Sequence, residues 1–293
     1  MSVLKAILAI LVITSVGAKP LKQRSGLFWQ VTKPGSTDSS YLFGTLHLLE
    51  QSYVDTMPNL MRALDRADIV LGEIVLDSAT KKEAAMLTAS VAPLDSILTP
   101  RQYAQVDSEL RHVLGMPLAF FNNFQPLAIY ALLIQGLYKK QHPENIRNGV
   151  LMDIYFQQRA KRAGKEVKGL ESLEDEADAL FGSLTPRKQV HELMDLIKHK
   201  AKVLKKLDEL LSAYRAGDLA KLLTEDDLGA PGDELMEGLL YKRNATWLKE
   251  LPAIFDSHNA FVAVGAGHLG GPRGLVSGLR KLGYQVVAIS PVH

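Results

Sequence analysis

Short strand-like segments recur in the first part of the chain. Leu27 to Val31 and Tyr41 to Phe43 are mostly apolar and flank the turn-rich stretch Lys33 to Asp38, which predicts a β-hairpin. Met57 to Arg66 has the periodicity of a helix. Asp68 to Val75 is a short, mostly apolar run with polar neighbours, so it predicts a buried strand.

The last part of the chain has a similar alternation. Phe261 to Val264 and Gln285 to Ile289 predict strands, and Gly274 to Leu282 between them predicts a helix. A compact unit of this kind favours two adjacent parallel strands joined by a right-handed crossover. One more strand is predicted in the middle of the chain, over Glu166 to Leu170.

Helical periodicity fills most of the chain between these strands. Apolar residues repeat at helical spacing from Ser78 to about Arg162 and again over Pro186 to Tyr214. Thr99-Pro100 and Thr185-Pro186 are typical helix starts, in which a capping side chain precedes a proline. The sequence therefore predicts an α/β fold, with a mixed central sheet formed by the N- and C-terminal segments and a large, mainly helical middle region.

Residues 1–18 have the three parts of a secretory signal peptide: a short basic start, an apolar run from Ala6 to Val16, and small residues up to Ala18. We expect cleavage there, which leaves residues 19–293 as a single domain with a helical insertion over about 78–251. No later run of about 20 apolar residues follows, so we expect no stable membrane insertion after cleavage. The expected location is periplasmic or secreted.

The amino-acid composition restricts the compartment and the class of partner that fit this chain. The chain has no cysteine, so an apolar core without disulfides must hold the exported fold, which fits a bacterial periplasm better than an animal extracellular space. The formal net charge is +2, from 34 basic and 32 acidic residues, and it gives no indication of a nucleic-acid partner. The oligomeric state stays open.

Two Gly-x-x-His motifs follow predicted strands near opposite ends of the chain, Gly44 to His47 and Gly265 to His268. Strand ends are where open α/β sheets position their ligand sites. Each glycine allows a sharp exit from the strand that a β-carbon would hinder, so each histidine projects from the end of the sheet. Alone, either histidine fits a structural role or a helix cap; as a pair, they predict one shared pocket.

Carboxylates provide the next candidates. Glu73 interrupts an apolar predicted strand, and a buried glutamate is usually paired, protonated or bound to a metal; the alternative is a solvent-facing position. Glu171 also follows a predicted strand, whereas Glu174 and Glu176 fit the first turn of a helix. Imidazole and carboxylate groups together suit Mn²⁺, Co²⁺ or Zn²⁺, and such a cation activates water for hydrolysis.

With several other segments, these motifs resemble the TraB/GumN family, which includes the Tiki proteins that antagonise Wnt signalling. The resemblance implies a fold similar to the erythromycin-esterase and ChaN-like α/β class. The matching segments span nearly all of residues 19–293, in family order: Phe28-Trp29, Gly44 to His47, Glu73, Gly169 to Ser172, Arg243-Asn244 with Trp247, and Gly265 to Gly270.

For the Tiki branch, the resemblance implies a protease that depends on a divalent metal, with Mn²⁺ or Co²⁺ favoured and Zn²⁺ possible. It implies that His47 and His268 are metal ligands or acid/base groups, and that Glu73 is a ligand or a general base. It adds Glu171 as a further ligand. The Arg243-Asn244 pair is implied to hold an oxyanion or a substrate carbonyl, and the alternative for Arg243 is a structural ion pair.

The leading hypothesis is therefore a metal-dependent hydrolase, a metalloprotease or peptidase that acts on exported or extracellular peptides. The absence of cysteines separates this chain from the cysteine-bearing animal Tiki ectodomains and argues against Wnt as its substrate. Two alternatives stay open. One is a metal-free ester or amide hydrolase with a histidine base, and the other is a non-catalytic protein that binds haem or a peptide.

Overall fold

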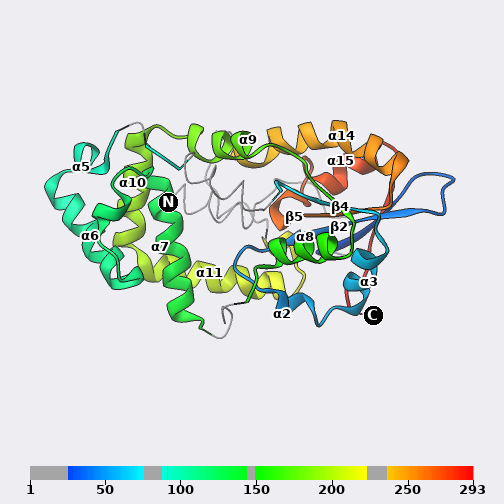
Figure 1. The fold of residues 1–293 in the computed structure, drawn as a ribbon, viewed down its shortest axis with the longest axis horizontal. Coiled ribbons are helices and arrows are strands. Elements are labelled where there is room, and N and C mark those ends of the chain that lie inside the picture. The colour runs from blue at the N-terminus through cyan, green and yellow to red at the C-terminus, as the bar shows by residue number, and fades with distance from the viewer. Residues whose placement is uncertain (1–25, 76–87, 91, 144–148, 223–235, 293) are drawn as a thin grey trace.

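A mixed β-sheet forms one end of the molecule (Figure 1). The structure is a computed structural model, and it describes residues 26–75, 88–90, 92–143, 149–222 and 236–292. Within these residues the sheet has six strands in the order β4-β3-β5-β2-β1-β6. The strands are β1 (Phe28–Thr32), β2 (Ser39–Thr45), β3 (Ile69–Gly72), β4 (Glu166–Gly169), β5 (Ala260–Gly265) and β6 (Gln285–Ala288).

The four neighbouring strands β4, β3, β5 and β2 run parallel to one another. β1 pairs with β2 in antiparallel fashion, with Phe28 opposite Phe43, which confirms the predicted hairpin. Segments from both ends of the chain therefore share one mixed sheet, and the predicted fold class is confirmed. The expected signal peptide and the first part of the expected helical middle, residues 78–87, lie outside the described residues.

The predicted pairing of the last two strands is wrong. β5 lies between β3 and β2, whereas β6 pairs with β1 in antiparallel fashion at the edge of the sheet. Every residue of β5 is buried, but Gln285 and Val287 of β6 are exposed. A strand buried on both faces belongs inside a sheet, and a half-exposed strand is suited to its edge.

Helices surround the sheet and form the opposite end of the molecule (Figure 1). The far end contains α5 (Leu94–Ile97), α6 (Pro100–Leu114), α7 (Pro126–Gln141) and α10 (Pro186–Lys198). Beside the sheet lie α3 (Pro58–Arg66), α8 (Met152–Arg162), α14 (Arg243–Ser257) and α15 (Leu275–Lys281). The other helical segments are α2 (Gln51–Val54), α9 (Leu173–Ala177), α11 (Lys200–Arg215), α12 (Leu219–Leu222), the 3₁₀ turns η1 (Leu118–Phe121) and η5 (Ala266–His268), and the π-helical η2 (Asp178–Gly182) and η4 (Glu237–Lys242).

The helix starts follow the predicted chemistry. The side chains of Thr99 and Thr185 accept backbone N–H groups in the first turns of α6 and α10, and a proline follows each cap. The single helix predicted over Pro186 to Tyr214 is instead two helices, because the backbone leaves helical geometry at His199 (φ −117°, ψ 28°). Helical apolar spacing on both sides of this break made the two helices resemble one.

Buried apolar side chains of the sheet and of the far helices belong to one hydrophobic cluster, which includes Phe43 of β2, Leu133 of α7 and Leu193 of α10. A shared core of this kind holds the two ends of the molecule together. In the part of the chain that the structure describes, no helix has both the length and the apolar character needed to cross a membrane.

Candidate metal and catalytic site

The carboxyl ends of four neighbouring parallel strands carry candidate site residues. In the order of the strands across the sheet, Glu171 follows β4, Glu73 follows β3, His268 follows β5 and His47 follows β2. Parallel strands end at the same edge of a sheet, which is the usual location of ligand sites in α/β folds. The topology therefore brings four distant parts of the sequence to one edge.

Gly44 allows the two Gly-x-x-His motifs to pack against each other. β2 and β5 are neighbours, with Gly44 opposite Val264. A β-carbon on Gly44 would lie 2.9 Å from Cα of Ala266 and 2.9 Å from Cδ1 of Leu269. The glycine is therefore required for this close approach, which is a different reason from the sharp exit expected from the sequence.

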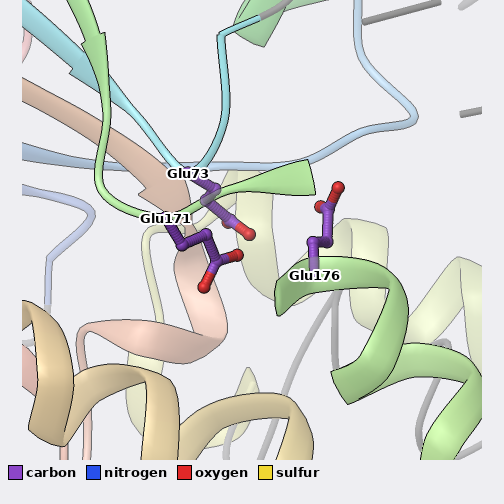
Figure 2. A group of neighbouring side chains, drawn as sticks. All are labelled: Glu73, Glu171 and Glu176. Carbon is purple, nitrogen blue, oxygen red and sulfur yellow. The ribbon is translucent and has the colours of Figure 1, made fainter. Parts of the chain in front are cut away.

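Three glutamates gather at this edge of the sheet (Figure 2). Glu73 comes from the end of β3, Glu171 from the loop after β4, and Glu176 from α9. One carboxylate oxygen of each lies within 4.8 Å of the other two. Glu73 is only 7% exposed, which agrees with the buried position predicted from its apolar neighbours.

Arg243, the first residue of α14, lies among these carboxylates and has all its N–H groups engaged. Its Nη2 donates to Glu73 Oε2 at 2.5 Å and also to Glu171 Oε1, and its Nε donates to the Glu171 carboxylate at 3.0 Å. Its Nη1 donates to the carbonyl of Leu239 at 2.9 Å and lies 3.3 Å from Nε2 of His268. Because every N–H has a protein partner, Arg243 holds two carboxylates in position.

His268 is buried and neutral. Asn244 donates through Nδ2 to the carbonyls of His268 and Arg273, so its Oδ1 accepts the Nδ1–H of His268 at 2.7 Å. This assigns the proton to Nδ1 and leaves the Nε2 lone pair facing Arg243 and Glu73, whose Oε1 is 3.8 Å away. Burial and the Arg243 charge lower the pKa of His268 to about 3, against the opposing attraction of Glu73. The ring packs on Trp247, with centroids 4.4 Å apart.

His47 is in a different environment. A third of its side chain is exposed, and its Nδ1 lies 2.9 Å from Oδ2 of Asp153, a residue in the first turn of α8. Burial lowers the pKa of His47, but the attraction and hydrogen bond of Asp153 outweigh this effect. With further attraction from Glu73 and Glu176, the pKa rises to about 9, so this imidazole is a cation at neutral pH.

The glutamates differ in charge state. Burial raises the pKa of Glu73, but the neighbouring Arg243 outweighs burial and holds this pKa far below its usual range. The backbone N–H of Gly265 also donates to Glu73 Oε1, at 2.7 Å. Burial and repulsion by Glu73 raise the pKa of Glu176 to about 7. The cluster thus combines a permanent carboxylate with a group that exchanges a proton near neutral pH.

The sequence model of the TraB/PrgY/gumN family matches residues 27–288. The chain belongs to this family. Its relatives include the metalloprotease TIKI2 of Danio rerio, 24% identical over 326 aligned positions that cover 93% of this chain and 63% of the relative. Metalloprotease TIKI1 of Homo sapiens is 24% identical, over 87% of this chain and 61% of the relative. The chain thus spans about three fifths of the length of these curated relatives.

In this member of the TraB/PrgY/gumN family, the three glutamates fit a divalent cation. Three carboxyl groups face the single charge of Arg243, and burial together with repulsion by Glu73 raises the pKa of Glu176, so a bound cation would stabilise its ionised form. Carboxylate oxygens suit hard cations such as Mn²⁺ better than Zn²⁺, which takes mainly nitrogen and sulfur ligands. The cluster of Glu73, Glu171 and Glu176 contains neither histidine.

Two residues beside the expected site were not candidates in the sequence. Glu176 does lie in the first turn of α9, as its interpretation as a helix-start residue predicted, but its carboxylate also joins the cluster. The one indication in the sequence that Glu176 belongs to the site was its position, a few residues after the predicted strand end that carries Glu171. Asp153 had no such signal, because its partner His47 is 106 positions away.

Proposed function

We propose that this chain is a divalent-metal-dependent hydrolase that cleaves peptide bonds in exported or extracellular peptides. The observation that carries the proposal is the cluster of Glu73, Glu171 and Glu176 at the sheet edge where the His47–Asp153 pair also lies. The similarity to named metalloproteases supports the hydrolase class. The secretory pattern of residues 1–18 supports the exported location of the substrate.

Glu73, Glu171 and Glu176 are the residues that would hold the cation; their oxygen ligands suit Mn²⁺, and the family resemblance favours Mn²⁺ or Co²⁺. When bound, a divalent cation supplies a Lewis acid that polarises a carbonyl and lowers the pKa of a water. Arg243 fixes the positions of Glu73 and Glu171 through its hydrogen bonds. Rigid ligands of this kind keep a site in one geometry.

The two histidines have separate roles in this proposal. Protonated His47, oriented by Asp153, is the group that donates a proton or a hydrogen bond to the reacting carbonyl or the leaving amine. Neutral His268, oriented by Asn244, is a positioning residue for Arg243 and Glu73. Glu176, with its pKa of about 7, is the group that accepts a proton from water when no cation binds it.

One observation favours a second candidate function, metal-free hydrolysis of an ester or amide. The guanidinium of Arg243 already pairs with Glu73 and Glu171, so its positive charge occupies part of the cluster that a metal ion would otherwise fill. In this case the His47–Asp153 pair and Glu176 would perform acid and base catalysis without a metal. The two candidates differ in their response to a chelator.

The test is the metal content of the purified full-length chain, measured by elemental mass spectrometry after loading with Mn²⁺, Co²⁺ or Zn²⁺. We expect near-stoichiometric metal in the wild type and little in Glu73→Gln or Glu176→Gln, because each change removes a charged ligand. Glu237→Gln is the matched control, since this glutamate pairs with Arg273 at the surface and should leave the metal unchanged.

The same samples are then screened against a peptide library. We expect turnover that a chelator abolishes and that His47→Ala lowers by roughly 10²- to 10⁴-fold. Turnover that survives chelation and complete metal removal, yet is lost in His47→Ala, would reject the metal-dependent proposal in favour of the metal-free candidate.

A further inference from the structure

A cavity of about 1070 Å³ opens beside the glutamate cluster. Glu171 and Arg243 belong both to its lining and to the candidate site, so the cavity reaches the proposed chemistry directly. Its volume is at the upper end of the range for small-molecule sites, which leaves room for an extended peptide segment. Most of its other lining residues take no part in the site described above.

Two π-helical segments line this cavity. Asp178 and Gly182 contribute from η2, and Gly238 and Lys242 from η4. η2 and η4 are the π-helical segments among the described residues, and they contact each other. π-helices are rare in proteins and are found frequently at functional sites. Their joint occurrence here is independent evidence that the cavity is functional.

Close packing fixes the two π-helical segments against each other. A β-carbon on Gly238 of η4 would lie 2.5 Å from Oγ of Ser183, at the end of η2. The same hydroxyl donates to the carbonyl of Ala179 at 2.7 Å, which satisfies a backbone group of the wide helical turn. The cavity wall is therefore held in place by direct contacts.

The cavity lining is acidic. Asp175, Asp178 and Glu250 are exposed along it, and Lys242 is its one exposed basic residue among those described. The charge of Arg243 is already balanced by Glu73 and Glu171. Among the described residues, the side-chain carboxylates of Asp178 and Glu250 have no hydrogen-bond or ion-pair partner, so both are available to a ligand.

We propose that this cavity is the substrate cleft of the enzyme and that Asp178 and Glu250 select peptides with basic side chains near the bond to be cleaved. The inference rests on the proposed peptidase function and adds its substrate class. Exposed carboxylates attract lysine and arginine side chains, and this attraction weakens as salt screens it. Acidic peptides would be repelled by the same groups.

The experiment measures the binding of fluorescein-labelled decapeptides to the full chain by fluorescence polarisation, without added metal. Three peptides share one sequence except at three positions, which are all lysine, all glutamine or all glutamate. The protein is the wild type, the double variant Asp178→Asn/Glu250→Gln, or the control Asp38→Asn/Glu209→Gln. The control removes the same charge from exposed positions outside the cavity lining.

We expect the wild type and the control to prefer the lysine peptide over the glutamate peptide. Removing an exposed carboxylate should weaken lysine-peptide binding by roughly two- to fivefold, so the double variant should lose most of the preference. The preference of the wild type should also shrink at high salt. An unchanged preference in the double variant would overturn the assignment of these two residues.

A steric variant tests the cleft independently of charge. Gly182 lines the cavity, and a β-carbon there would meet no atom within 4 Å, so Gly182→Phe adds a ring towards open space. We expect Gly182→Phe to weaken all three peptides at least tenfold while its metal content equals that of the wild type. Unweakened binding in this variant would overturn the location of the cleft.

The outcomes separate this inference from the proposed function. Peptide cleavage with no preference for basic residues would leave the peptidase proposal intact and reject the selectivity proposed here. Selective binding of the lysine peptide without cleavage under any metal would reject the peptidase proposal, while the cleft and its preference for basic peptides would stand.

Discussion

At the scale of single residues, two arginines show how burial changes the contribution of an ion pair to the free energy of unfolding. Arg243 is 6% exposed and pairs with Glu73 and Glu171, which are also buried. Arg273 pairs with Glu237 through two hydrogen bonds of 2.6 and 2.7 Å, but about half of both side chains is exposed. Water screens the second pair and not the first.

We therefore expect Arg243→Met to lower the free energy of unfolding by about 3–5 kcal/mol, because it leaves two buried carboxylates without their cation. Arg273→Met should lower it by less than about 1 kcal/mol. Urea unfolding of both variants measures the difference. Equal losses would contradict the buried, charge-balancing role of Arg243.

At the scale of elements, the short helix α9 orients Glu176 towards the other glutamates. Ser172 begins α9 with a capping box, in which its hydroxyl accepts the backbone N–H of Asp175 and the Asp175 carboxylate accepts the backbone N–H of Ser172. The same arrangement joins Thr99 and Gln102 at the start of α6, at the far end of the molecule. The caps of α9 and α6 make the same hydrogen bonds, but only the cap of α9 lies beside the glutamate cluster, so the cap of α6 is a matched control.

Ser172→Ala and Thr99→Ala should each lower the free energy of unfolding by about 1 kcal/mol, the usual effect of losing an N-cap. Only Ser172→Ala should also weaken metal binding, because fraying of α9 releases Glu176 from the cluster. Metal titration and urea unfolding of both variants provide the comparison. Equal metal affinity in the two variants would show that α9 does not position a ligand.

At the scale of the whole molecule, the sheet and the far helices share one hydrophobic cluster. The sequence prediction of a single domain over residues 19–293 implies that both ends unfold together. Trp29 in β1 and Trp247 in α14, the chain's two tryptophans, both report on the sheet end. Far-ultraviolet circular dichroism instead follows all helices, including those at the far end.

We expect tryptophan fluorescence and circular dichroism to give the same urea midpoint, because a shared core makes unfolding cooperative. Two separated midpoints, with the helical signal lost first or last, would contradict the single-domain prediction and identify the far helices as an independent unit.

Local patterns in the sequence were sufficient for most elements and for several site residues. Alternating or continuous apolar runs predicted the strands, and the Thr-Pro pairs predicted the starts of α6 and α10. Glu73 was recognisable as buried because it interrupts an apolar strand. These features depend only on residues that are close together in the chain, so local sequence patterns are enough to predict them.

The tertiary structure alone decided how these pieces meet. β6 lies beside β1 and not β5 because its exposed residues suit an edge. Arg243 pairs with Glu73 across 170 positions, and His47 pairs with Asp153 across 106. Contacts between such distant residues depend on the packing of the whole sheet and its helices. No local periodicity encodes them, and for that reason the charge state of each histidine emerged only from the fold.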